Sequence, residues 1–91
     1  VVDAVHGRVP VLLDSGVRTG ADIVKALALG AAAVLVGRPY VHGLALGGEA
    51  GVRHVLRCLL ADLDINLALT GHRSPAELSP DALVSSRLLE A

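Results

Sequence analysis

Two short apolar runs, each closed by a glycine and an arginine, most constrain how this chain can fold. Val11–Leu13 and Ala31–Val36 are continuous in apolar residues rather than alternating with polar ones. The clusters DSGVR and GRP follow them directly. A short continuous apolar run is typical of a strand in a parallel sheet that is covered on both faces. We therefore expect two buried parallel strands.

The segment between the two runs is predicted to be a helix. Thr19 is its expected N-cap, and Asp22 stands three residues later, where its carboxylate can face the unpaired amides of the first turn. Gly30 stands where a left-handed residue would end the helix.

Beyond Pro39 the pattern predicts a loop and then a long helix. The glycine-rich passage Gly43–Gly48 is expected to be the loop. From Glu49 apolar residues recur at helical spacing, and Gly71 is the expected stop. The apolar face is predicted to hold Val52, Val55, Leu56, Leu59, Leu60, Leu63 and Leu67, and the outward face Arg53, His54, Arg57 and Asp62. A capping box with proline at the first helical position is predicted at Ser74–Glu77, and Ser79–Asp81 begins a second short surface helix in the same way.

The order strand, helix, strand, helix implies parallel strands joined by a right-handed crossover. Two such units cannot close a sheet. A (β/α)₈ barrel takes about 250 residues, so this chain would supply roughly a quarter of one. Its apolar faces are then expected to need a partner surface.

Composition excludes several classes of function. The net charge is −1, and the eight Lys and Arg residues are scattered without aromatic residues among them, so we expect no nucleic-acid partner. The single cysteine, Cys58, excludes an internal disulfide framework and fits a reducing, cytoplasmic location. The longest uncharged apolar run, Ala26–Gly37, is shorter than the roughly 20 residues of a membrane span.

The two clusters are expected to meet, because the carboxyl ends of neighbouring parallel strands lie at one edge of the sheet. Glycines let backbone amides approach a ligand, the helix near Thr19 offers a positive N-terminus, and Arg18 and Arg38 supply forked donors. This combination predicts a phosphate site. Asp14 would repel a bare phosphate, so it favours a ligand with hydroxyl groups as well, such as a ribityl or ribose phosphate. Ordinary turn glycines and loop arginines are the alternative explanation.

The stretch VLLDSGVRTGADIVKALALGAAAVLVGRP resembles the C-terminal region of the FMN-dependent α-hydroxy acid oxidase and dehydrogenase family, which includes glycolate oxidase, lactate oxidase and the flavin-type lactate dehydrogenase. GGEAGVRHVLRCLLADLDINLALTGHRSPAEL continues the resemblance, which runs from Arg8 to Leu83. It implies an α/β fold, the TIM (β/α)₈ barrel. Residues 1–91 would be a partial FMN hydroxy acid dehydrogenase domain, made of the seventh and eighth βα units and a C-terminal tail.

The resemblance implies FMN as the cofactor and carries its contacts over to six residues: Asp14, Ser15, Gly16, Arg18, Gly37 and Arg38. Asp14 would face the ribityl hydroxyls. The backbone of Ser15 and Gly16 and the Arg18 side chain would line the phosphate end, and the Gly37 amide with the Arg38 guanidinium would complete the cradle. Many relatives have glycine where Ser15 stands.

The resemblance also implies a reaction, in which the α-hydrogen of a small 2-hydroxy acid such as L-lactate or glycolate is removed and two electrons pass to FMN. This needs a base and a carboxylate clamp, which the family places in an HGxRxLD-like stretch before the first strand. The HGR at His6 stands where relatives have an ordinary loop. We therefore assign no catalytic residue, and we expect the 91-residue chain alone neither to turn over substrate nor to retain flavin tightly. The full-length protein is expected to be a tetramer-like homo-oligomer.

Two other interpretations remain open at this point. One is another phosphate-binding barrel, of the inosine-monophosphate dehydrogenase or isopentenyl-diphosphate isomerase type. The other is a non-catalytic remnant or assembly module that associates through exposed strand edges. The histidines His42, His54 and His72 have no metal-site spacing, and Cys58 is expected to act as a small structural hydrophobe.

Overall fold

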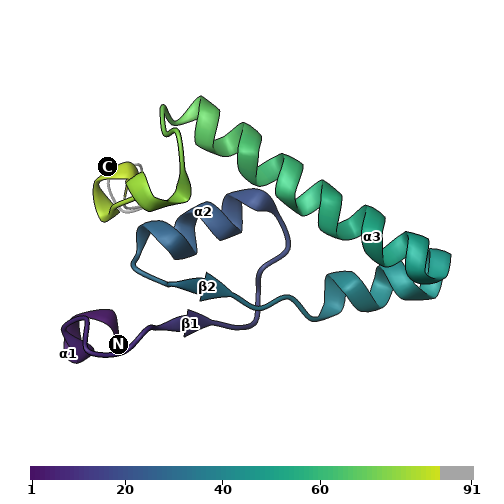
Figure 1. Ribbon diagram of the computed structural model, residues 1–91, viewed down its shortest axis with the longest axis horizontal. Coiled ribbons are helices and arrows are strands. Elements are labelled where there is room, and N and C mark those ends of the chain that lie inside the picture. The colour runs from purple at the N-terminus through teal and green to yellow at the C-terminus, as the bar shows by residue number, and fades with distance from the viewer. Residues whose placement is uncertain (85–91) are drawn as a thin grey trace, which may run out of the picture.

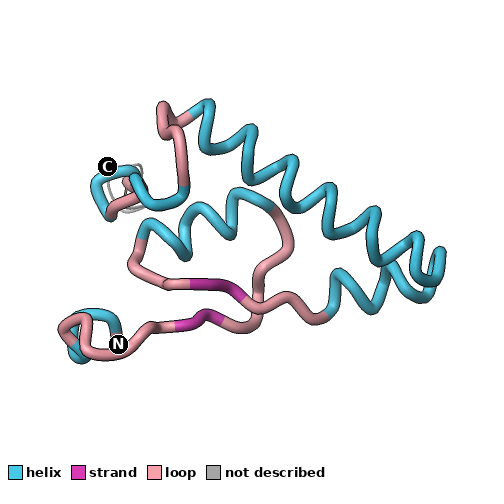
Figure 2. Tube along the Cα trace, in the orientation of Figure 1, coloured by secondary structure: helices cyan, strands magenta, loops and turns pink. Residues whose placement is uncertain are grey.

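The computed structural model describes residues 1–84 and shows two short strands with helices packed on one side of them (Figure 1). In chain order the elements are α1 (Val2–Val5), β1 (Leu12–Leu13), α2 (Gly20–Ala28), β2 (Ala33–Val34) and α3 (Arg38–Leu69), followed by 3₁₀ turns at Pro75–Glu77 and Pro80–Ala82. Helix α2 lies between the strand pair and the long arm of α3 (Figures 1 and 2).

The two strands pair in parallel, with Leu12 opposite Ala33 and Leu13 opposite Val34. Flanking bonds run from the Ala32 amide to the Val11 carbonyl at 2.7 Å and from the Leu35 amide to the Leu13 carbonyl at 2.8 Å. The strands are shorter than the apolar runs that predicted them, since within residues 1–84 each has a single neighbour to continue its ladder.

The expectation that both strands are buried is wrong for the chain as it stands. Leu12 is 56% exposed and Leu35 is 49% exposed. An apolar run that suits a sheet covered on both faces needs neighbours on both faces. Within the described residues, α2 covers one face of the strand pair, and the other is open to solvent.

Helix α2 begins and ends as its sequence predicts. Thr19 accepts a bond from the Asp22 amide at 3.3 Å, and the Asp22 carboxylate accepts one from the Thr19 amide at 3.1 Å, which makes a complete capping box. At the other end Gly30 adopts φ +109°, its amide bonds to the Leu27 carbonyl, and the Ala31 amide bonds to the Ala26 carbonyl. This pair of bonds is a Schellman motif.

Helix α3 differs from the prediction, because the passage Gly43–Gly48 is not a loop. The chain is helical from Arg38 and breaks only at Gly47 and Gly48, where Gly48 adopts φ +60°, before the long arm continues to Leu69. The break folds the first arm back beside the second, so that the backbones of Gly43 and Gly51 touch. Glycine has a low helix propensity, but here the missing side chains allow two helical arms to pack closely.

The core lies between α2 and the long arm of α3. Val17, Ile23 and Leu59 are buried and pack with the partly buried Leu27, Val34, Val36, Val55 and Leu63. The predicted apolar face of the long helix is therefore only partly used, since Leu56 is 44% and Leu60 is 63% exposed. Asp62, which was predicted to face outward, is instead half-buried at the contact with α2.

The long arm ends at a second Schellman motif, with Gly71 at φ +81° and bonds from the Gly71 and His72 amides to the Ala68 and Leu67 carbonyls. The prediction of a capping box at Ser74 is wrong. The Ser74 side chain makes no capping hydrogen bond, and the Glu77 carboxylate accepts a 2.8 Å bond from the Arg73 amide instead of the Ser74 amide. The two short segments are 3₁₀ turns because prolines begin each of them and only one turn follows. Within residues 1–84, no helix has the length and apolar character that crossing a bilayer would require.

Candidate functional site: the cavity at the strand ends

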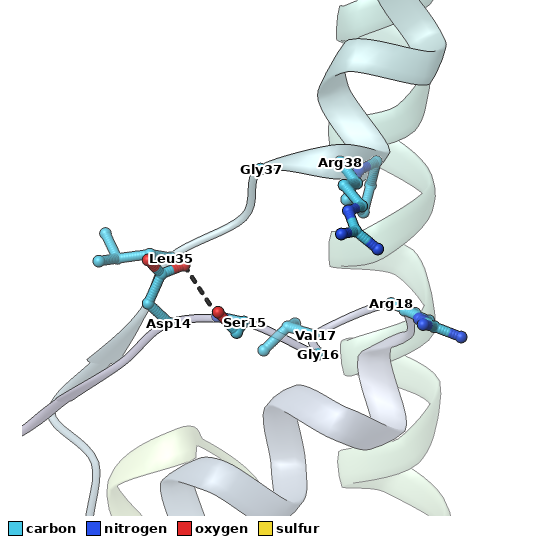
Figure 3. A pocket seen from close by; sticks show the side chains of 9 residues that line it. Asp14, Ser15, Gly16, Val17, Arg18, Leu35, Gly37 and Arg38 are labelled. Atoms are coloured by element: carbon cyan, nitrogen blue, oxygen red, sulfur yellow. Dashed lines mark hydrogen bonds between the residues drawn. The ribbon is translucent and has the colours of Figure 1, made fainter.

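The chain leaves β1 through a loop with two successive left-handed residues. Ser15 and Gly16 both adopt φ +78°. The Ser15 amide donates a 2.8 Å bond to Oδ1 of Asp14, which holds that carboxylate against the turn (Figure 3). The loop then reaches Val17, which is 4% exposed and anchors it in the core, while Arg18 stays exposed beside it.

The chain leaves β2 through Gly37 and enters α3 at Arg38. No side chain caps this helix, and Pro39 occupies its first turn. The amides of a first helical turn have no acceptor within the helix. The N-terminus of α3 therefore presents free donors beside the Arg38 side chain.

These two strand exits meet around one cavity of about 270 Å³. Its lining contains every residue predicted for the site, together with three apolar ones: Asp14, Ser15, Gly16, Val17, Arg18, Leu35, Gly37, Arg38 and Pro39. Figure 3 shows the β1 loop on one side of the cavity and the Gly37–Arg38 segment on the other. Val17, Leu35 and Pro39 were not among the residues predicted for the site. In the sequence, an apolar residue beside a strand end looks like any other core residue. No local pattern therefore identifies these three as part of the site.

The geometry of the cavity fits the phosphate end of a nucleotide. A Cβ built on Gly16 or on Gly37 would meet no other atom within 4 Å, so both glycines border open space. Two arginines, Arg18 and Arg38, line the cavity together with one acidic residue, Asp14. Arginine forks and helix N-terminal amides are the groups that proteins use to bind phosphate, and a carboxylate accepts from hydroxyl groups.

The N-terminus of α2 does not contribute in the way predicted from the sequence. The amides of Arg18 and Thr19 donate to Oδ2 of Asp22 at 3.0 and 3.1 Å, and the Gly20 amide donates to Oδ2 of Asp62 at 2.6 Å. The Arg18 amide bond lowers the pKa of the Asp22 carboxyl below its ordinary 3.8, against the opposing effect of desolvation. Two carboxylates thus occupy the donors that were expected to face a phosphate. The free helix N-terminus at this site is that of α3, where the sequence predicted a loop.

The other polar candidates lie outside the cavity. His6 is at the C-terminus of α1, before β1 begins, and so at the other end of the strand. His54 contacts the Cys58 thiol at 3.6 Å on the exposed side of α3, and His72 contacts the Thr70 hydroxyl at 2.9 Å. Among residues 1–84, no group of three or more His, Cys, Asp or Glu side chains has the arrangement of a metal site.

These elements define a parallel α/β fold with a cationic cavity at the carboxyl ends of its strands. The chain belongs to the FMN-dependent dehydrogenase family, whose family model matches residues 1–85. The resemblance stated from the sequence is thereby confirmed, and the match favours this family over the other phosphate-binding barrels.

Individual relatives agree with the family match. An FMN-dependent alpha-hydroxy acid dehydrogenase of Schizosaccharomyces pombe is 61% identical over 85 residues, which are 91% of this chain and 21% of the relative. A peroxisomal (S)-2-hydroxy-acid oxidase of Oryza sativa is 57% identical over 79 residues, 87% of this chain and 22% of the relative. The crystal structure of (S)-mandelate dehydrogenase, described as a monotopic membrane protein, superposes with a TM-score of 0.85 at 54% identity, over 90% of this chain and 22% of that one.

The chain therefore spans about a fifth of the length of these relatives. One of them is described as peroxisomal and one as membrane-associated. The predicted cytoplasmic location consequently stays a prediction.

Proposed function

We propose that this chain is the part of an FMN-dependent 2-hydroxy acid oxidoreductase that holds the phosphate end of the flavin nucleotide. The observation that carries the proposal is the cavity where both strand exits meet, lined by Arg18 from the β1 loop and by Arg38 from the start of α3. Family membership supplies the cofactor class, since the family is that of FMN-dependent dehydrogenases.

In this proposal the two arginines hold the phosphate as forked donors. The Gly37 amide and the uncapped first turn of α3 donate to the same group, as helix N-termini do toward anions. Gly16 and Ser15 let the backbone pass close to the ligand, and the Asp14 carboxylate accepts from the ribityl hydroxyls. A phosphate site at the last strands of a TIM barrel, formed with the N-terminus of an extra helix, is a recurrent arrangement.

We further propose that residues 1–91 are the end of a (β/α)₈ barrel, with β1–α2 and β2–α3 as its seventh and eighth units; residues 85–91 of this domain lie outside the described part. The exposed Leu12 and Leu35 support this assignment, because neighbouring strands and helices of a barrel would cover them.

FMN, when bound, accepts the two electrons that leave a 2-hydroxy acid such as lactate, glycolate or mandelate. The residues of this chain bind the cofactor and orient it. The proton-abstracting base would come from other segments of the barrel, because His6 stands at the far end of β1 from the cavity. A homo-oligomeric state of the whole enzyme remains a prediction.

A hybrid protein tests the proposal. In the (S)-mandelate dehydrogenase, the segment that matches this chain is replaced by the residues of this chain, a replacement that 54% identity and a TM-score of 0.85 favour. We expect the hybrid to purify with FMN and to bind FMN more tightly than riboflavin, which lacks the phosphate. Replacing Arg38 by alanine should weaken FMN binding by about tenfold or more, since hydrogen bonds to charged groups contribute about 1.5–3 kcal/mol.

The matched control is Arg57→Ala, which removes an exposed arginine of α3 that does not line the cavity. Its FMN affinity should equal that of the unmodified hybrid. Riboflavin affinity should be the same in the unmodified hybrid, in the Arg38→Ala variant and in the Arg57→Ala variant. A hybrid in which Arg18→Ala and Arg38→Ala together leave the preference for FMN intact would refute the proposed phosphate site.

A further inference from the structure

Two carboxylates accept hydrogen bonds from three successive backbone amides, those of Arg18, Thr19 and Gly20, where the β1 loop enters α2. The local one, Asp22, accepts from Arg18 and Thr19, while the distant one, Asp62 on α3, accepts from Gly20 at 2.6 Å. These bonds hold the end of the loop that carries Arg18 to two helices, to α2 through Asp22 and to α3 through Asp62.

Asp62 is itself held in place. It is half-buried, and the Asn66 side-chain amide donates to the Asp62 carbonyl oxygen at 2.8 Å and to its Oδ1 at 3.3 Å. The contact with α2 is close, because a Cβ on Gly20 would lie 2.8 Å from the Asp62 Cβ and would collide with the backbone of Asp62 and Leu63. A carboxylate fixed in this way leaves the N-terminus of α2 little freedom to move along α3.

The first arm of α3 carries the other side of the cavity. Arg38 begins this arm, and Asp62 lies on the long arm beyond the break at Gly47 and Gly48. Arg18, Thr19, Pro39 and Asp62 line a second cavity, of about 310 Å³, next to the first. The loop that bears Arg18 is held to the long arm of α3 by the Gly20–Asp62 bond, and the arm that begins at Arg38 is held to the same long arm by the close packing of Gly43 on Gly51.

We infer that Asp62 is a positioning residue of the phosphate cradle, which sets the spacing between the Arg18 and Arg38 guanidinium groups through its bond to the Gly20 amide. This inference rests on the proposed function, because it assumes that the two arginines share one phosphate. Asp62 does not line the phosphate cavity. It acts through the backbone that follows Arg18.

Asp62 variants of the hybrid described above test the inference by their affinities for FMN and for riboflavin. Asp62→Ala removes the acceptor and should weaken FMN binding by about tenfold, the loss expected for one charged hydrogen bond. Riboflavin binding should change by less than about twofold, because only the phosphate contacts depend on the spacing of the arginines. Asp64→Ala is the matched control, since Asp64 is an exposed acid two residues along the helix that lines a different cavity. It should bind both flavins like the unmodified hybrid.

Two conservative variants separate position from charge. Asp62→Asn keeps an acceptor oxygen at the same reach and should retain most of the FMN preference. Asp62→Glu keeps the charge but moves the acceptor by one methylene, so it should lose the preference. The opposite order, with glutamate tolerated and asparagine not, would overturn the inference, as would an equal loss of FMN and riboflavin affinity in Asp62→Ala. An unmodified hybrid without any preference for FMN would instead overturn the proposed function, and this inference with it.

Discussion

The backbone amide of Arg18 donates a 3.0 Å hydrogen bond to Oδ2 of Asp22, four residues further along the chain. The bond joins the end of the β1 loop to the first turn of α2. It is also the largest cause of the lowered pKa of the Asp22 carboxyl, ahead of the bond from the Thr19 amide. One side chain thus couples the cap of a helix to the conformation of the loop that bears an arginine of the cavity.

The lowered pKa of Asp22 predicts an acid-dependent loss of stability. Because the carboxyl has a lower pKa in the folded chain than in the unfolded one, its ionised form stabilises the fold at pH values above the ordinary value of 3.8, and this contribution disappears as the pH falls through the folded pKa. Asp22→Asn should therefore be less stable than the unmodified chain near neutral pH. The difference should shrink as the pH is lowered below about 4.

Urea unfolding followed by circular dichroism at a series of pH values measures this difference. The control is Thr19→Ser, which keeps a hydroxyl cap and the Asp22 carboxylate, so its pH dependence should match that of the unmodified chain. A stability difference for Asp22→Asn that stays constant into strong acid would contradict the assignment.

The backbone conformation of the neighbouring residues Ser15 and Gly16 predicts that Ser15→Gly and Gly16→Ala change the stability of the fold in opposite directions. Both adopt φ +78°, a conformation that costs a residue with a side chain about 1 kcal/mol or more. Ser15→Gly should therefore stabilise the fold by about 0.5–1 kcal/mol. Gly16→Ala should destabilise it by about 1–2 kcal/mol, and this cost is conformational because a Cβ there meets no other atom within 4 Å.

Chemical denaturation of the two variants against the unmodified chain gives both signs in one experiment. FMN affinity in the hybrid should survive Ser15→Gly, because the Ser15 amide, which bonds to Asp14, remains. The same sign of stability change in both variants would show that φ does not govern this loop.

Two glycines of the β2–α3 segment predict a separation of binding from stability. A Cβ on Gly43 would lie 2.7 Å from the Gly51 carbonyl oxygen and from Val55 Cγ2, so Gly43→Ala should destabilise the fold by about 1–3 kcal/mol despite the better helix propensity of alanine. A Cβ on Gly37 meets nothing within 4 Å and borders the cavity. Gly37→Ala should therefore leave stability nearly unchanged but weaken FMN binding, because the methyl group occupies the approach of the phosphate.

Melting temperature and FMN affinity of the two hybrid variants check this pair. The prediction requires that each variant moves mainly one of the two quantities. If Gly37→Ala binds FMN as tightly as the unmodified hybrid, the phosphate does not approach that amide.

The parts of the fold that were predicted correctly depend on residues close together in the chain. The Thr19–Asp22 capping box and the Schellman motif at Gly30 each involve residues within one or two turns, so the local sequence suffices. The gathering of Asp14–Arg18 with Gly37–Arg38 also followed from sequence, because parallel strands bring their carboxyl ends together whatever lies between them.

The predictions that failed depend on contacts between distant segments. Gly43–Gly48 was expected to be a loop because glycine has a low helix propensity. In the structure Gly43 and Gly51 lie so close together that only residues without side chains fit there, and this contact accommodates glycines within a helix. Asp62 was placed on the outward face by periodicity, and the Gly20 amide that it caps lies 42 positions away in the chain. The exposure of Leu56 and Leu60 likewise depends on what packs against the helix, which periodicity does not specify.

By itself the sequence determined the Thr19 cap, the helix ends at Gly30 and Gly71, the parallel strand pair and the cluster of candidate site residues, because these follow from short-range backbone chemistry and from strand polarity. The family was indicated by the resemblance of the sequence. Only the tertiary structure decided which helix offers its N-terminus to the cavity. The amides of α2 are taken by Asp22 and Asp62, and those of α3 are free of side-chain caps. A helix N-terminus attracts an anion only where its donors are unpaired, and the pairing at α2 depends on a carboxylate that folding brings from another helix.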